Sequence, residues 1–392
     1  MANIRNLSRL TNKQLMIQQL FNHPQTSRVE LARILNLNKS TVSAIFNDLN
    51  KTGLIKSLGL GDSTNSGGRR PHLITLNKRC GWVACFDIGG YGLRSLVTYL
   101  NGEMIQVADK PLDNIDVNEL LQEIDRMMAE FQANDDTDHG LLGIGFSVHG
   151  IVYQNHIQST PFFDFKSVDL QKYFQDKYGV PVILENEANA VAVFEHDFGM
   201  ESDIDDLITI SIHAGLGVGI IVDGQLYRGY RGLAGEIGRQ LVRQPGDLSN
   251  SLVKVESLCS EKAIMDRFRQ LKRRPNYSTK QLCLLYKQGD TDTVKVIDDA
   301  VSILTGAIYN AIVAYGPQEV YLNSPLMESL PDIFQKVRHR LVALNMNVPV
   351  YQIEGSRYPS LLGASSLIIH HVLGMENYSL KFKWPKKVNH RD

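Results

Sequence analysis

The spacing of apolar residues over the first fifty positions predicts three helices. Their ranges are residues 11–21, 28–35 and 39–50. Ser27 and Asn38 stand immediately before the second and third helices, and both residue types favour helix N-caps. Two helices joined by a short turn form a helix-turn-helix. Two strand-like segments at residues 54–58 and 72–76 follow, so residues 1–78 are expected to form a winged helix-turn-helix domain.

Beyond residue 80 the pattern changes to buried strands, glycine-containing turns and helices. Apolar runs typical of buried strands lie at residues 82–88, 93–100, 141–148, 182–184, 207–212 and 220–222. Helical spacing occurs at residues 117–132 and 168–178. A hairpin followed by helices therefore occurs twice, which predicts an α/β body of two lobes, residues 79–190 and 191–392. A C-terminal helix at about residues 361–375 is expected to pack back on the first lobe.

The charge distribution changes at the same point in the chain. Residues 1–80 contain twelve Lys or Arg and three Asp or Glu, whereas the other 312 residues contain 29 and 39. The net charge of −1 therefore conceals a basic N-terminal domain on an acidic body. Such a domain indicates a polyanionic partner for that part alone. A basic face that only keeps the domain soluble is the simpler alternative, and the helix-turn-helix pattern favours nucleic acid.

The third predicted helix and the hairpin carry the candidate DNA contacts. Small polar groups and one ammonium group face outward from this helix at Lys39, Ser40, Thr41, Ser43 and Asn47. Such groups reach base edges and phosphates in a major groove, although a solvated helix surface would show the same residues. Between the two strands, the sequence Gly-Gly-Arg-Arg-Pro places two guanidinium groups on a glycine-rich tip. We expect Arg69 and Arg70 to enter a narrow minor groove.

Neither a membrane span nor secretion is indicated. The most apolar stretch, residues 207–222, is interrupted by polar residues and glycines and falls short of the ~20 apolar residues of a span. The N-terminus carries basic residues without an apolar segment, so no secretory signal is expected. The four cysteines form no CxxC pair, which is typical of reduced thiols in a cytoplasmic protein.

The most specific motif is residues 212–239, with a Gly-x-Gly-x-Gly turn, an Asp-Gly hairpin and a Gly-Glu-Ile-Gly segment. With ENEAN at residues 185–189 and LLGAS at residues 361–365, it resembles the signature of the ROK family of repressors, open reading frames and sugar kinases. GGRRP at residues 67–71 is similar to the end of the winged domain in the family's repressors. ENEAN and LNKSTVS (residues 37–43) most resemble the family's xylose repressors. The resemblance covers essentially the whole chain and implies a two-lobed, actin-like sugar-kinase fold with a sugar site between the lobes.

The resemblance also implies roles for individual residues. Glu187 occupies the position of the carboxylate that takes a proton from a sugar hydroxyl in the family's kinases, and Asn186 that of a sugar-hydroxyl ligand. Glu236 and Glu256 match two further carboxylate ligands. Arg239 replaces a zinc-binding histidine and is expected either to donate to a sugar hydroxyl or to pair with one of those carboxylates. Such groups suit vicinal hydroxyls, although Glu187 at a helix start would be favourable even without a ligand.

Departures from the family pattern predict that neither ATP nor zinc is bound. Where the kinases have Asp-x-Gly-Gly-Thr-Lys, residues 87–92 read Asp-Ile-Gly-Gly-Tyr-Gly, without the hydroxyl and ammonium that hold phosphate. The second phosphate loop reads His-Ala-Gly at residues 213–215, and a Gly-Gly turn is replaced by Asn-Ser-Pro at residues 323–325. The zinc-binding cysteine cluster is missing, so no metal is expected.

Two functions remain open. The first is a DNA-binding transcriptional repressor that binds a sugar between its lobes, D-xylose by resemblance, and is thereby released from its operator. The alternative is an ATP-dependent sugar kinase with a DNA-binding appendage. Because a single winged domain binds too weakly for selective repression, we expect a homodimer or a dimer of dimers on a near-palindromic operator.

Overall fold

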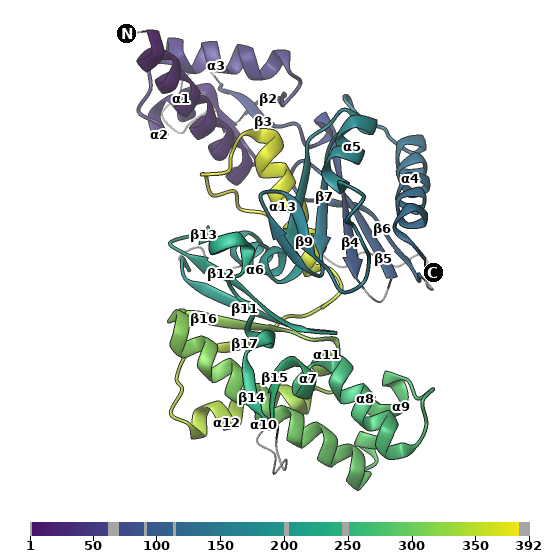
Figure 1. Ribbon diagram of the computed structural model, residues 1–392. Coiled ribbons are helices and arrows are strands. Elements are labelled where there is room, and N and C mark those ends of the chain that lie inside the picture. The colour runs from purple at the N-terminus through teal and green to yellow at the C-terminus, as the bar shows by residue number, and fades with distance from the viewer. Residues whose placement is uncertain are drawn as a thin grey trace.

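The computed structural model describes residues 2–61, 70–89, 92–112, 115–199, 204–244 and 251–383. The N-terminal domain, the first lobe and the second lobe follow one another along the molecule (Figure 1). The first lobe lies between the other two parts, and the C-terminal chain, in yellow, returns to it and to the N-terminal domain.

The N-terminal domain is the winged helix-turn-helix that the sequence predicts. Its helices are α1 (Ala2–Asn22), α2 (Arg28–Ile34) and α3 (Lys39–Lys51). A small sheet has the order β1-β3-β2, with β1 (Thr26–Ser27), β2 (Ile55–Leu60) and β3 (His72–Leu76). The Ser27 hydroxyl accepts a hydrogen bond from Glu30 N at 3.2 Å and caps α2. Asn38 is the N-cap residue of α3, as predicted, although its side chain forms no capping hydrogen bond.

The first lobe is built on a five-stranded sheet in the order β10-β7-β4-β5-β6. The strands are β4 (Trp82–Gly89), β5 (Gly92–Tyr99), β6 (Met104–Lys110), β7 (Leu141–Val148) and β10 (Val182–Asn186). β4, β5 and β6 are antiparallel, whereas β7 and β10 are parallel to β4. β4, β5 and β7 are buried over most of their length because helices cover both faces, whereas the edge strand β6 is largely exposed. α4 (Val117–Ala133) and α5 (Leu170–Tyr178) cover one face, and α13 (Pro359–Leu373) covers the other.

The second lobe repeats this topology in a sheet of order β13-β12-β11-β16-β17. The strands are β11 (Leu207–Ile212), β12 (Leu216–Val222), β13 (Gln225–Leu226), β16 (Glu319–Asn323) and β17 (Val350–Gln352). β12 begins at Leu216, so the expectation that the strand starts only at residue 220 is wrong. Gly219 lies within β12. The position requires glycine because a Cβ atom there would stand 2.0 Å from the Ala188 carbonyl oxygen. The glycines therefore allow a close approach of β12 to a helix.

The remaining elements surround the two sheets. They are the hairpin strands β8 (Ile151–Tyr153) and β9 (His156–Ser159), β14 (Leu241–Arg243) and β15 (Leu252–Lys254), the 3-10 turns η1 (Lys78–Cys80), η2 (Tyr230–Gly232) and η3 (Ile237–Arg239), and the helices α7 (Glu256–Cys259), α8 (Glu261–Lys272), α9 (Thr279–Lys287), α10 (Thr291–Tyr315), α11 (Pro325–Ser329) and α12 (Pro331–Ala343). In the described part of the chain, only α10 is long and apolar enough to cross a membrane. Its apolar face, including Val301 and Ile308, belongs to the core of the second lobe, which accounts for its composition.

Helix α6 (Glu187–Phe198) joins the two lobes. It continues directly from β10 of the first sheet, packs against β11 and β12 of the second, and makes its most extensive contact with α13. A Cβ atom at Gly363 of α13 would lie 1.7 Å from the Ala190 carbonyl oxygen. α6 is therefore held on both sides by close backbone contacts.

Candidate functional site

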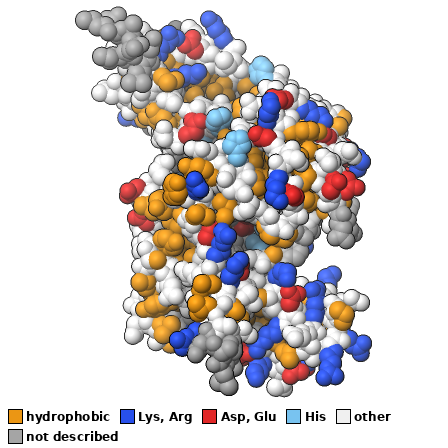
Figure 2. Space-filling view, in the orientation of Figure 1, with side chains coloured by type: hydrophobic (Ala, Val, Ile, Leu, Met, Phe, Trp, Pro, Cys, Tyr) orange, Lys and Arg blue, Asp and Glu red, His pale blue; other side chains and the backbone are white. Residues whose placement is uncertain are grey.

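A cavity of about 680 Å³ lies between the two lobes. The first lobe contributes Asp87, Arg94 and His149 to its wall, and the second lobe contributes His213 and Arg269. The space-filling view is hollowed between the two lobes on the side where β4 ends and β5 begins, with basic side chains near the entrance (Figure 2). The cavity therefore collects titratable groups from segments that are distant in the sequence.

Asp87, at the end of β4, is the most heavily bonded carboxylate in this cavity. It is 1% exposed and forms an ion pair with Arg94 at 3.1 Å. His149 Nε2 lies 3.2 Å from the same carboxylate, and Ser147 and Ser360 donate to it at 3.0 and 2.6 Å. Burial alone would raise the pKa of Asp87, but Arg94 and His149 hold it well below its usual range. Asp87 is therefore ionised and fully partnered.

Glu187, the first residue of α6, lies behind this cavity, next to the wall residue His213. None of the five predicted sugar ligands lines the cavity of about 680 Å³ itself. Glu187 is 5% exposed and accepts hydrogen bonds from Ser211 at 3.1 Å and Asn323 at 3.4 Å, while His213 Nε2 lies 3.3 Å away. Burial opposes ionisation, but the charge and hydrogen bond of His213 lower the pKa of Glu187 overall. The His149 and His213 rings, whose centroids are 5.8 Å apart, link the two carboxylate clusters across the lobes.

The side chain of Asn186 is already engaged within the first lobe. Its oxygen caps α6 by accepting from Asn189 N at 3.1 Å, and its amide group donates to the Gly150 carbonyl at 2.7 Å. One lone pair of the oxygen and one amide hydrogen remain for another partner. Its assignment as a sugar ligand stays a prediction.

Glu236, Arg239 and Glu256 lie close together in the second lobe. Arg239 pairs with Glu236 at 3.7 Å, and both side chains are partly exposed. Glu256, at the start of α7, is a neighbour of the same turn, because a Cβ atom at Gly238 would lie 2.8 Å from its carboxylate. Burial raises the pKa of Glu236, Glu256 raises it further, and Arg239 opposes them. Of the two contacts expected for Arg239, the pair with a carboxylate is present, with Glu236. The other, contact with a sugar hydroxyl, stays a prediction.

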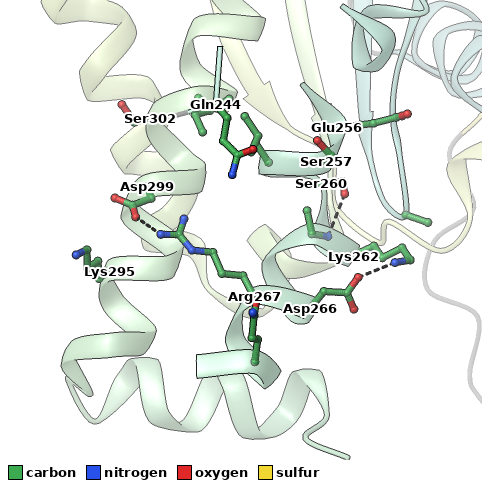
Figure 3. A pocket seen from close by; sticks show the side chains of 15 residues that line it. Gln244, Glu256, Ser257, Ser260, Lys262, Asp266, Arg267, Lys295, Asp299 and Ser302 are labelled. Carbon is green, nitrogen blue, oxygen red and sulfur yellow. Dashed lines mark hydrogen bonds and ion pairs between the residues drawn. The ribbon is translucent and has the colours of Figure 1, made fainter. Parts of the chain in front are cut away.

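Glu256 also lines a second cavity, of about 940 Å³, between α8 and α10 (Figure 3). Its wall mixes polar and apolar side chains and contains the ion pairs Lys262–Asp266 at 2.6 Å and Arg267–Asp299 at 2.7 Å. Ala214, Lys262 and Asp266 line both cavities, so the two adjoin beside the residue 213–215 turn. Among the described residues, no group of three or more His, Cys, Asp or Glu is placed to hold a metal ion.

Arg94, His149 and Asn323 are parts of this site that the sequence analysis did not single out as site residues. The sequence could have indicated Arg94, because the predicted hairpin over residues 82–100 places it directly opposite Asp87, as the β4–β5 register has it. Opposite charges facing each other across a strand pair stabilise a sheet. His149 and Asn323 belong to different lobes, and no spacing along the chain connects them with Asp87 or Glu187.

The N-terminal domain presents the candidate DNA contacts as expected on α3. Val42, Ile45 and Leu49 are buried, while the predicted contacts lie at exposed or partly exposed positions. These positions are Lys39, Ser40, Thr41, Ser43 and Asn47. Arg70 is exposed before β3, and Arg69 lies outside the described residues.

Comparison with known proteins agrees with these observations. Residues 83–370 match the ROK family, and residues 8–56 match a winged helix-turn-helix DNA-binding family. The xylose repressor of Lactiplantibacillus pentosus is 38% identical over 375 residues, 95% of this chain and 96% of that protein. The xylose repressor of Staphylococcus xylosus is 30% identical, over 95% of this chain and 98% of that protein. A crystal structure of a ROK family transcriptional regulator, a homologue of the E. coli Mlc protein, has a TM-score of 0.73 at 22% identity and covers 94% of this chain and 98% of its own.

The chain belongs to the ROK family. Within that family it is a transcriptional regulator of the xylose-repressor type, with a DNA-binding winged helix-turn-helix at its N-terminus. Its curated relatives of similar length are repressors rather than kinases.

Proposed function

We propose that this protein represses xylose-utilisation genes in the cytoplasm and leaves its operator when D-xylose binds between its lobes. The observation that carries the proposal is the similarity of the whole chain to xylose repressors, with a winged helix-turn-helix at its N-terminus. The interlobe cavity, with Glu187 beside its wall residue His213, supports a ligand site between the lobes. The proposed sugar ligands are Asn186, Glu187, Glu236, Arg239 and Glu256. Carboxylate, amide and guanidinium groups together supply the acceptors and donors that a polyol needs.

The phosphate-binding segments favour a binding role over the alternative kinase role. Residues 87–92 and 213–215 lack the hydroxyl and ammonium groups with which the family's kinases hold phosphate. The three partners of Glu187, which are Ser211, Asn323 and His213, all approach its Oε1 atom. In this proposal its Oε2 atom accepts from a sugar hydroxyl. We therefore propose that neither ATP nor a metal ion takes part.

Binding of one sugar by both lobes explains how the ligand acts at a distance. A cleft that closes around a ligand is favoured because only the closed state satisfies all its hydroxyls. Closure changes the position of one lobe relative to the other and, in a dimer, the spacing between two DNA-binding domains. Couplings of this kind are typically about 1–3 kcal/mol, and operator DNA must weaken sugar binding by the same factor.

The decisive experiment measures operator affinity with and without saturating D-xylose, in the wild type and in Glu236→Gln. The wild type should bind the operator more weakly with xylose, by about 5- to 150-fold, and the variant should lose this response. Xylose binding that leaves operator affinity unchanged or tighter contradicts release by sugar. ATP-dependent phosphorylation of pentoses or hexoses that disappears in Glu187→Ala would establish the kinase instead.

The proposed DNA-binding residues are tested by the salt dependence of operator binding. Arg70→Ala should reduce the slope of log K against log salt by about 0.9 for each phosphate that the variant no longer neutralises. Lys287→Ala removes the same charge from an exposed position on the second lobe and should leave the slope unchanged. Ser40→Ala should alter base preference more than the slope. Equal slopes for Arg70→Ala and the wild type would show that Arg70 does not contact DNA.

Assembly is tested by sedimentation of the full chain. A homodimer, or a dimer of dimers, should be present at the concentrations at which the operator is bound, because a near-palindromic operator requires two DNA-binding domains. A monomer that binds the operator with full affinity would contradict this part of the proposal.

A further inference from the structure

The N-terminal domain contacts the body in two places. Near the covalent connection, Asn77 donates to Asp138 at 2.8 Å and His139 Nε2 lies 3.2 Å from the Thr52 carbonyl oxygen. The second contact is made by the chain that follows α13. We call residues 375–382 the C-terminal strap.

Main-chain groups of the strap bond to α1, with Gln18 and Asn22 donating to the Ser379 carbonyl at 2.9 and 3.2 Å. Lys381 N donates to the Asn22 side chain at 2.8 Å. The strap therefore lies along α1 and fixes its position (Figure 1).

A single aromatic ring in the strap joins α1 to α6. The Phe382 ring packs edge-on against Phe21 of α1, with centroids 4.9 Å apart, and stacks on Phe198 of α6 at 4.8 Å. Phe382 N also donates to the Asp197 carbonyl at 3.0 Å. Phe382 and Phe198 are each 5% exposed, and Phe21 is 8% exposed. The three rings form a buried contact between the DNA-binding domain and the last turn of α6.

The other end of α6 lies at the proposed sugar site. Glu187 is its first residue and Phe198 its last. Its twelve residues span about 18 Å. Ala188 lies in close backbone contact with Gly219 of the second lobe, and Ala190 with Gly363 of α13. The Thr209 hydroxyl, on β11 of the second lobe, donates to the Ala188 carbonyl at 3.1 Å.

We propose that α6 and the C-terminal strap carry the state of the interlobe cleft to the DNA-binding domain, through the Phe198–Phe382–Phe21 contact. This inference rests on the proposed function, because it assumes that the ligand binds at Glu187. Closure of the second lobe displaces the sheet to which α6 is bonded, and α6 transmits the displacement because close-packed elements shift as units. At its far end the ring of Phe382 converts that shift into a new orientation of α1. Movement of the second lobe thus reorients the N-terminal domain through packing contacts, and not only through the covalent connection between the two.

The test compares two substitutions of equally buried phenylalanines. Phe382→Leu removes the ring that links α6 to α1. Phe131→Leu is the matched control, since Phe131 is also 5% exposed but lies on α4, on the opposite face of the first sheet. For each variant, D-xylose affinity is measured by calorimetry, and operator affinity by fluorescence anisotropy with and without saturating xylose. The ratio of the two operator affinities is the coupling.

Phe382→Leu should bind xylose within about twofold of the wild type while its coupling falls at least about fivefold. Phe131→Leu should keep the wild-type coupling. Full coupling in Phe382→Leu, or an equal loss in Phe131→Leu, overturns the inference.

A second variant and the wild-type ratio separate the other outcomes. If Phe382→Leu does not fold, the double variant Gln18→Ala/Asn22→Ala removes the strap's hydrogen bonds from the surface of α1, and the same loss of coupling is expected. A wild-type ratio of one contradicts the proposed release by xylose, and with it the relay. A wild type that responds while both strap variants respond equally well contradicts the relay alone.

Discussion

Asp87, on the wall of the interlobe cavity, and Glu187, behind the wall residue His213, are both buried carboxylates, but their partners differ in kind. Asp87 is paired with a permanently charged guanidinium and also accepts from Ser360 of α13, so it binds together parts of the first lobe. Glu187 has two neutral donors and a histidine, and these come from strands of the second lobe. The buried ion pair of Asp87 with the guanidinium of Arg94 is costly to break. By contrast, the neutral donors of Glu187, Ser211 and Asn323, can be exchanged for sugar hydroxyls while His213 keeps its place. The first arrangement suits a structural link and the second a ligand site.

The largest effect is expected when the structural link is broken. Asp87→Asn leaves Arg94 and His149 without their counter-charge and should lower the free energy of unfolding by about 3–5 kcal/mol. The measurement is denaturant unfolding at neutral pH. Asp109→Asn is the control, because its pair with Arg357 at 3.5 Å is exposed and is worth less than about 1 kcal/mol. Similar losses in both variants would remove the distinction between the two carboxylates.

A smaller effect on stability, but a clear one on binding, is expected at Glu187. Glu187→Gln keeps an oxygen for Ser211 and Asn323, so the free energy of unfolding should change by less than about 1.5 kcal/mol. D-xylose affinity should fall by roughly 10- to 150-fold, the value of a hydrogen bond to a charged group. Calorimetric titration measures this, and operator affinity without sugar should be retained. Wild-type xylose affinity in the variant would show that Glu187 is not a sugar ligand.

The smallest effect concerns the pH dependence of the structural link. Burial lowers the pKa of His149, but Asp87 outweighs it and the pKa is raised above the ordinary 6.5. The folded state therefore binds the proton more tightly, and this stabilisation is complete below the unfolded pKa and is lost as pH rises through the folded pKa. Unfolding measured from pH 6 upward should show stability falling for this reason, and His149→Gln should flatten that part of the profile. An unchanged profile in the variant would assign the slope to another group.

Much of the fold could be predicted because its elements have strong local patterns. The strands 141–148 and 207–212 were predicted with the bounds that the structure has, and the repeated order of hairpin and helices corresponds to two sheets of the same topology. β12 was predicted too short because glycines were interpreted as a turn. They are glycines because α6 passes so close to the strand, which is a tertiary contact that no local pattern shows.

The sequence by itself determined the class of each part of the chain. Helical spacing and Ser27 define the helix-turn-helix, the buried positions of α3 define its outward face, and ENEAN places Glu187 at a helix start. These are properties of short segments, in which spacing along the chain fixes which side chains share a face.

Only the tertiary structure decided which other residues those side chains contact. His149, His213 and Asn323 come from three separate strand ends, and Phe21, Phe198 and Phe382 meet although 361 positions separate the first from the last. Such contacts depend on how the lobes and the C-terminal strap pack, because burying the apolar faces of α6 and α13 brings these distant segments together.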